Sequence, residues 1–160
     1  MTTEIELSEY TATIKWQRDD QDFLGDNYSR GHVWEFDGGV SVPASASPDI
    51  VPLPKSVAEN VDPEEAFVAS LSACHMLFFL SVAAKKGYVI DNYMDCAIGH
   101  MGRNESGKYA MTKVILRPGV AFSGDKRPTS EQLDKMHELS HAQCFIANSV
   151  STEVSIEPVV

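Results

Sequence analysis

The sequence has few cysteines, and none of them form a motif. Only three of the 160 residues are cysteines, Cys74, Cys96 and Cys144, and no two stand in a C-x-x-C arrangement. Three is a poor number for the disulfide framework of a secreted protein. We therefore expect a reduced, cytoplasmic setting, in which a disulfide is transient rather than structural.

Basic residues are scarce as well. The chain has 13 Lys and Arg against 23 Asp and Glu, a formal net charge of -10. Such a charge is repelled by a nucleic-acid backbone and by an anionic membrane surface, so we expect neither as a partner. The opening residues, MTTEIELSEY, lack the basic and apolar pattern of a secretory signal.

Long apolar runs are limited to one segment, residues 67–84. It barely reaches the length of about 18 residues that a membrane span requires, and it contains His75 and three serines. A buried central helix is the better interpretation. With 43% hydrophobic and 22% charged residues, the composition is that of a globular protein, and we predict a single domain over residues 1–160.

The remaining pattern alternates as β-strands do. We predict strands or hairpins in YTATIKWQ, SRGHVWEFDGGVSV, YMDCAIGHMGR, YAMTKVILRPGV and STEVSIEPV, with a proline-rich loop over residues 43–61. Hairpins dominate, and strands alternate little with helices. The predicted class is therefore α+β, with antiparallel sheets.

Two helices are marked by their ends. Asp62 and Pro63 begin the first, and Gly87 ends it. Thr129, with Gln132 three residues on, begins a second that we extend to about Asn148. The first helix is apolar on nearly every side, so one sheet cannot cover it. We expect a homodimer that packs two copies of this helix together.

Cys74 stands in the middle of the apolar helix. An apolar environment raises the pKa of a thiol, and only the thiolate is nucleophilic, so a reactive Cys74 needs a cation from elsewhere in the fold. On composition alone, an inert core cysteine explains the residue equally well. Cys96, which we place in a strand between Asp95 and Ala97, is interpreted as inert.

His137, His141 and Cys144 fall on one face of the second helix. Their spacing leaves three interpretations open. They are zinc ligands, since His-x3-His on a helix suits zinc; or they line a cleft around a second thiol; or they are ordinary helix residues.

The segment DPEEAFVASLSACHMLFFLSVAAKKG, followed by a second cysteine at position 144, resembles the OsmC/Ohr family of thiol peroxidases. The resemblance runs roughly from Tyr10 to Val159. It implies that Cys74 is the reactive cysteine, that Cys144 is the second one, and that Glu64 is the family's glutamate. The sequence YSRGHVWEF places the family's arginine at Arg30.

The chain departs from the family pattern at two positions. Phe145 follows the second cysteine where the family usually has proline, and His75 follows the reactive cysteine where an aromatic residue is common. These departures indicate a divergent branch.

The resemblance implies an OsmC-like fold, a long buried central helix and an intertwined dimer. It also implies reduction of alkyl or fatty-acid hydroperoxides in oxidative-stress defence, without a cofactor. Cys74 would become a sulfenic acid and then form a disulfide with Cys144, which an external dithiol, such as a lipoyl protein, would reduce. Arg30 would lower the pKa of Cys74, and Glu64 would hold Arg30.

Glu64 and Cys74 are ten residues apart, roughly 15 Å along a helix at 1.5 Å per residue. We therefore expect Glu64 to serve the site of the other subunit. Two alternatives remain open: a non-catalytic protein that binds a small apolar ligand on the same fold, and a zinc-binding variant that uses His75, His137, His141 and Cys144.

Overall fold

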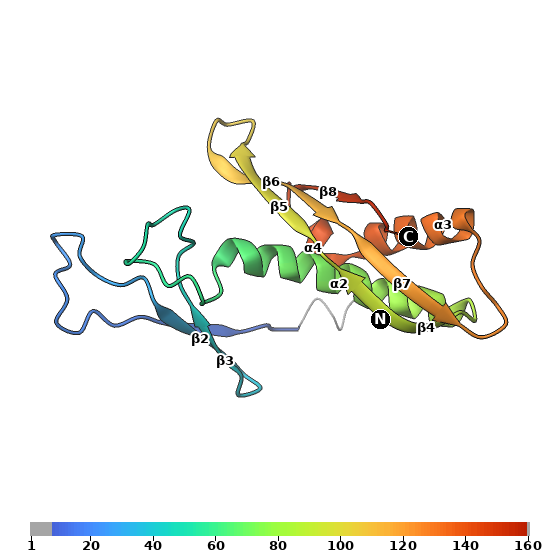
Figure 1. The fold of residues 1–160 in the computed structure, drawn as a ribbon, viewed down its shortest axis with the longest axis horizontal. Coiled ribbons are helices and arrows are strands. Elements are labelled where there is room, and N and C mark those ends of the chain that lie inside the picture. The colour runs from blue at the N-terminus through green and yellow to red at the C-terminus, as the bar shows by residue number, and fades with distance from the viewer. Residues whose placement is uncertain (1–7, 160) are drawn as a thin grey trace. The chain divides into compact units, whose positions relative to one another are not determined.

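The computed structural model describes residues 8–159, which divide into two compact units. The first unit ends at Pro63 and the second begins at Glu64. Three sheets and three helices are present in the described residues, and only one of the sheets belongs to the first unit (Figure 1). The predicted α+β class is confirmed. The single domain over residues 1–160 stays a prediction.

The first unit contains a three-stranded antiparallel sheet. Its strands are β1 (Ala12–Lys15), β2 (His32–Phe36) and β3 (Ser41–Ala44), in the order β1-β2-β3. The predicted hairpin at Asp37-Gly38-Gly39 is present, and Gly39 turns the chain with φ 94°, a conformation that glycine adopts at no steric cost. The proline-rich loop follows β3, as predicted.

Helix α2 (Pro63–Lys85) has the bounds that its end signals predict. It stops just before Gly87, whose φ of 83° lies in the left-handed region that closes many helices. Its buried residues recur every three or four positions and so form one face: Leu71, His75, Phe79, Val82 and Ala83. By length and composition this helix could cross a membrane, a test that core helices of soluble proteins also pass.

The opposite face of α2 is exposed within the chain. It consists of small and apolar residues at helical spacing, namely Ala69, Ala73, Leu77, Ser81 and Ala84. Leu77, the largest residue of this face, is 62% exposed. The expectation that protein surrounds the helix is thus met on one face only, because the two sheets and the two later helices of the second unit pack on the other.

The second unit contains one long hairpin that is interrupted in the middle. β5 (Ile98–Arg103) pairs with β6 (Tyr109–Leu116), and β4 (Val89–Asp95) pairs with β7 (Pro118–Ser123), all antiparallel. The two strands that we predicted here are therefore each divided in two. At the interruption, the side-chain Oδ1 of Asp95 accepts a hydrogen bond from the Arg117 N–H at 2.6 Å and replaces a ladder bond. Cys96 lies in this break and is exposed, so its predicted position within a strand is wrong.

The end of the chain adds two helices and a strand. α3 (Ser130–Gln143) begins with the predicted capping box of Thr129 and Gln132. It ends earlier than predicted, because Cys144 has extended backbone angles (φ -62°, ψ 114°) and starts a separate short helix, α4 (Phe145–Asn148). The last strand, β8 (Glu153–Ile156), pairs with β6 in parallel, the one parallel pair among the described strands.

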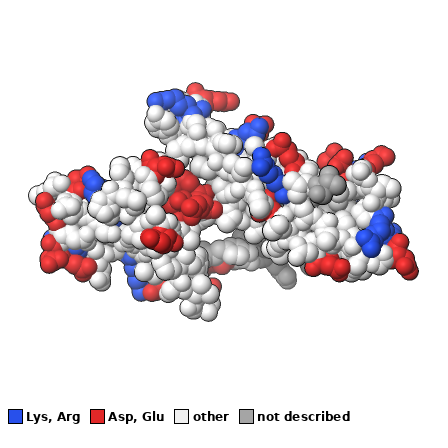
Figure 2. All heavy atoms as spheres, viewed as in Figure 1, with Lys and Arg blue, Asp and Glu red and all other residues white. Residues whose placement is uncertain are grey.

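Two apolar clusters fill the second unit. One joins the C-terminal half of α2 to β4, β7 and α3 through Phe79, Val82, Tyr88 and Met136. The other joins the N-terminal half of α2 to β6, β8 and α4 around Leu71, Val114 and Leu116. α2 is thus the central element of this unit. On the surface, the acidic side chains lie in several separate groups with basic ones between them (Figure 2).

Candidate active site

The two cysteines that the sequence analysis selected are in contact. Cys74 lies on α2 and is partly buried, whereas Cys144 lies at the break between α3 and α4 and is almost completely buried. The two side chains interact, since Cys74 contributes to the raised pKa of Cys144, and both thiols are free. A disulfide between them requires the two sulfurs to lie about 2 Å apart.

Cys144 is held in a protonated state. Burial raises the pKa of its thiol, and the hydrogen bond with Cys74 raises it further. The backbone N–H of Ala147 donates to Cys144 Sγ at 3.5 Å and opposes part of this shift. Cys74 is thus the more accessible thiol of the pair, and Cys144 is the buried one with the raised pKa.

Phe145 occupies the position that the resemblance assigns to proline. It is the first residue of α4, a helix position at which proline is also favoured because its missing N–H is not needed there. Its ring packs edge-on against Phe78 of α2, with centroids 5.0 Å apart. The departure at Phe145 thus leaves the geometry of Cys144 at the helix start intact.

His75 forms a buried pair with His137. Nε2 of His75 and Nδ1 of His137 lie 3.0 Å apart, the rings are stacked at 9°, and both stack on Phe79. Burial lowers the pKa of each ring to about 4, so both are neutral at pH 7. His75 therefore fills the place of an aromatic residue and binds α3 to α2.

The zinc alternative does not agree with this geometry. His75 and His137 use one nitrogen each to bond to one another, and Cys144 bonds to Cys74 and Ala147. In residues 8–159, no group of three or more His, Cys, Asp or Glu side chains is placed to hold a metal ion. The predicted set of His75, His137, His141 and Cys144 is therefore wrong as a ligand set.

Arg30 precedes β2 in the first unit and is fixed there by three contacts. Its Nη2 pairs with Asp26 Oδ1 at 2.5 Å, its Nη1 donates to the Tyr28 carbonyl at 2.7 Å, and its guanidinium lies 3.7 Å from the centre of the Tyr28 ring. Lys55 also pairs with Asp26, and these two partners lower the pKa of Asp26 to about 2. Asp26 is thus a carboxylate partner of Arg30 that the sequence analysis missed.

Arg30 also borders an apolar pocket of about 560 Å³ in the same unit. Its walls are mainly aromatic and aliphatic and include Ile14, Trp16, Phe23 and Tyr28. The rings of Trp16, Phe23 and Tyr28 pack against one another, with centroids 4.8 to 6.0 Å apart. Such a lining, with one cation at its edge, suits a ligand that has an apolar body and one polar end.

Asp95 is a second residue that the sequence analysis missed. Its Oδ2 accepts a hydrogen bond from Ser72 Oγ at 2.5 Å, two residues before Cys74, while its Oδ1 caps the break in the long hairpin. One carboxylate thus attaches the turn of α2 that carries Cys74 to two strands. Glu64 lies one position inside the start of α2, as predicted, and its pairing with Arg30 stays a prediction.

The comparison with known families decides the identity of the fold. Residues 56–159 match the model of the OsmC-like proteins. The chain belongs to the OsmC family. The matched range includes Cys74, Cys144 and all of α2, and it confirms the family predicted from the sequence.

Solved structures agree with this assignment. An OsmC-like protein of unknown function from Vibrio cholerae O1 biovar eltor is 57% identical, with a TM-score of 0.94 over 96% of this chain and 100% of the other. An organic hydroperoxide resistance protein from Elizabethkingia anophelis is 18% identical, with a TM-score of 0.68 over 95% and 94%. OhrB, the organic hydroperoxide resistance protein of Bacillus subtilis, is 18% identical, with a TM-score of 0.64 over 96% and 99%. The comparison with curated proteins gives no match.

These neighbours confirm the OsmC fold, with its antiparallel sheets and central helix. The relatives named for hydroperoxide resistance share the fold at low identity, whereas the 57% identical relative has no stated function. The OsmC family thus includes organic hydroperoxide resistance proteins.

Proposed function

We propose that this OsmC protein is a cytoplasmic, cysteine-based peroxidase that reduces organic hydroperoxides. The observation that carries the proposal is the contact between the partly buried Cys74 and the buried, protonated Cys144. A pair of this kind, one thiol accessible and one behind it, is what a peroxidase with a resolving cysteine requires.

The reaction has three steps. The Cys74 thiolate attacks the outer oxygen of the hydroperoxide, the O–O bond breaks, and the alkoxide leaves with a proton as the alcohol. The sulfur of Cys144 then attacks the Cys74 sulfenic acid and releases water, which leaves a Cys74–Cys144 disulfide. An external dithiol, such as a lipoyl protein, reduces this disulfide by exchange and becomes oxidised itself.

The substrate class follows from the apolar surroundings. The apolar residues of α2 around Cys74 favour an alkyl or fatty-acid tail over hydrogen peroxide, because burial of the tail contributes roughly 25 cal/mol per Å². Arg30 is proposed to orient the peroxide and to favour the Cys74 thiolate, with Glu64 of the second subunit as a further partner.

Intact-mass analysis after one equivalent of cumene hydroperoxide tests the proposal. A Cys96→Ser background prevents cross-linking through the exposed third thiol. In that background we expect the loss of two hydrogens and the release of one equivalent of cumyl alcohol. Cys74→Ser should abolish both, whereas Cys144→Ser should release the alcohol once and leave a sulfenic acid that dimedone traps.

Two outcomes of this experiment would contradict the proposal. Oxidation that persists in Cys74→Ser but is lost in Cys144→Ser would reverse the two roles. No reaction of either thiol with any organic hydroperoxide would exclude the enzyme. The aromatic pocket of the first unit would then favour the second candidate, a non-catalytic protein that binds a small apolar ligand.

A further inference from the structure

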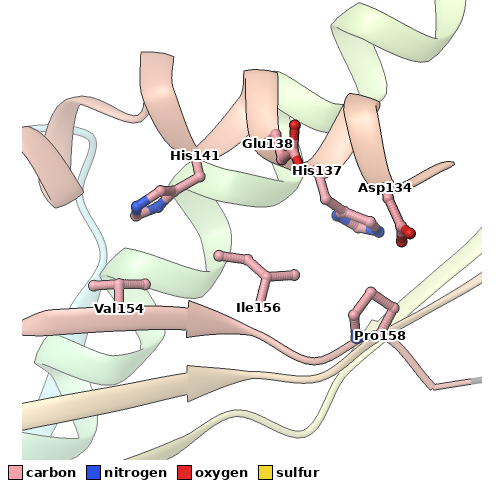
Figure 3. Close-up of a pocket in the computed structure, with 7 residues that line it drawn as sticks. All are labelled: Asp134, His137, Glu138, His141, Val154, Ile156 and Pro158. Atoms are coloured by element: carbon pink, nitrogen blue, oxygen red, sulfur yellow. The ribbon is translucent and has the colours of Figure 1, made fainter. Parts of the chain in front are cut away.

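The second unit contains a cavity that the proposed peroxidase chemistry does not use. It lies between α3 and the chain around β8 and has a volume of about 340 Å³ (Figure 3). Asp134, His137, Glu138 and His141 of α3 line one side, and Val154 and Ile156 of β8 line the other. The volume is within the range of sites for small organic molecules.

Two ring nitrogens at this cavity lack a partner. His137 is 3% exposed and uses Nδ1 for the bond to His75, while its Nε2 has no hydrogen-bond partner among residues 8–159. Nδ1 of His141 is buried and equally without a partner in that range. A buried polar atom that lacks a partner costs about 1–3 kcal/mol, so a ligand group that bonds to these nitrogens gains affinity from them. In Figure 3 both rings project from α3 toward the opposite wall.

The charges around the cavity favour a cation. Asp134 and Glu138 bring two carboxylates, and none of the described residues that line the cavity is a lysine or arginine. Burial lowers the pKa of His137 to about 4, so its ring adds no positive charge at pH 7. An anion would meet two negative charges and no donor of opposite sign, whereas an ammonium group would meet carboxylates and a ring nitrogen.

The opposite wall determines the rest of the ligand. Val154 and Ile156 are aliphatic and project toward the two histidines (Figure 3). A short alkyl chain packs on such side chains and loses its contact with water. We propose that this cavity is a binding site for a small organic cation, a primary amine on a short alkyl chain, whose ammonium group donates to His137 Nε2 and to the carboxylate of Asp134, with the charge of Glu138 adding to the attraction.

The proposal fixes the positions of two protons. If His137 Nε2 accepts from the ligand, Nδ1 of the same ring carries a hydrogen and donates to Nε2 of His75. His75 then carries its own hydrogen on Nδ1. The bound amine would thus be connected through two rings to α2, one residue from Cys74. The inference itself does not depend on the peroxidase activity.

Nitrogen-15 NMR of the imidazole rings provides the test, with n-butylamine as the probe and n-butanol and butyrate as matched neutral and anionic controls. At neutral pH we expect His137 in the Nδ1–H form and shifts of the His137 and His141 signals with n-butylamine, at a dissociation constant on the order of millimolar. n-Butanol and butyrate should each bind at least about tenfold more weakly, a difference of 1.4 kcal/mol.

Two variants localise the binding. Asp134→Asn with Glu138→Gln removes both charges at constant shape and should weaken n-butylamine at least about tenfold. Glu131→Gln is the control, because Glu131 is an exposed carboxylate of the same helix and does not line the cavity. The proposal would be overturned if the double variant and the Glu131→Gln control bound n-butylamine with equal affinity. It would also be overturned if His137 carried its hydrogen on Nε2, or if n-butanol bound as tightly as n-butylamine. Shifts of the two rings with Zn²⁺ and none with the amine would overturn it as well.

Discussion

Nε2 of His75 and Nδ1 of His137 lie 3.0 Å apart and connect the two helices of the core through neutral rings. Each ring has its pKa lowered from 6.5 to about 4, by burial in the first place. When His137 and His141 are protonated, their charge lowers the pKa of His75 further, and the negative charge of Asp95 partly opposes this effect. The unfolded chain therefore binds more protons than the folded chain between about pH 6.5 and 4.

We predict that the free energy of unfolding falls as the pH decreases through this window. The loss should reach at most roughly 3 kcal/mol for each ring and should level off below about pH 4. Chemical denaturation from pH 7.5 to 4.5 measures it. His137→Phe should be less stable at pH 7.5 but lose less between the two pH values, whereas His100→Gln, at an exposed position, should follow the wild type. Parallel pH curves for all three proteins would show that the pair is not the titrating group.

Asp95→Ala should destabilise the protein by about 2–4 kcal/mol, because it removes two hydrogen bonds to a charged acceptor and leaves the Arg117 N–H without its partner. Urea denaturation measures the change. Asp91→Ala is the control, since Asp91 is exposed and accepts one hydrogen bond, from Ser123. It should cost less than about 1 kcal/mol, and equal costs for both variants would contradict the role of Asp95.

Asp26→Asn should slow the first oxidation of Cys74 severalfold and leave the fold intact. The substitution removes the negative charge that holds both Arg30 and Lys55, so the guanidinium loses its fixed position. Stopped-flow kinetics with cumene hydroperoxide measures the rate. Glu35→Gln, which removes the exposed Lys15 ion pair of the same unit, should leave the rate unchanged. If both variants react at the wild-type rate, Asp26 has no part in positioning Arg30.

Cys96→Ala should retain full peroxidase turnover and cost at most about 1 kcal/mol of stability. The reason is its position in the break of the long hairpin, where the side chain is exposed and outside both apolar clusters. Steady-state turnover and thermal unfolding check this. A folded Cys96→Ala variant without activity would show that the wrong thiols have been assigned.

The exposed face of α2 should be covered by a second copy of the chain. Ala69, Ala73, Leu77 and Ala84 leave an apolar stripe that one chain does not bury, and small residues allow two helices to approach closely. Sedimentation should show a homodimer at micromolar concentration. Leu77→Arg should dissociate or unfold it, whereas Leu139→Arg, at a partly exposed position of α3, should not. A folded wild-type monomer at that concentration would rule the dimer out.

Much of this structure was visible in the sequence, because it depends on neighbouring residues. Asp62 and Gly87 delimit α2, and Thr129 with Gln132 begins α3, because helix caps act over a few residues. The contact of Cys74 with Cys144 was predicted only through the family resemblance. No local pattern connects two residues on different helices.

The features that were missed depend on residues far apart in the chain. Asp95 bonds to Ser72 and Arg117, at separations of 23 and 22 residues, so its strand looked continuous. The bond between His75 and His137 spans 62 residues, and spacing alone left His137 as a zinc ligand, a cleft residue or an ordinary helix residue. Asp26 is only four residues from Arg30, but the pairing depends on a loop in which Asp26 has a positive φ. The periodicity of the sequence does not predict this conformation.

The parallel pairing of β8 with β6 leaves one edge of β6 unpaired until late in synthesis. A ribosome releases β5 and β6 before β8, and they can form their hairpin at once, because few residues separate them. The other edge of β6 receives its partner only when residues 153–156 emerge, after both later helices. Until then the edge beside Val114 and Leu116 is open to pairing with another nascent chain. β8 thus closes the edge at which premature association would begin.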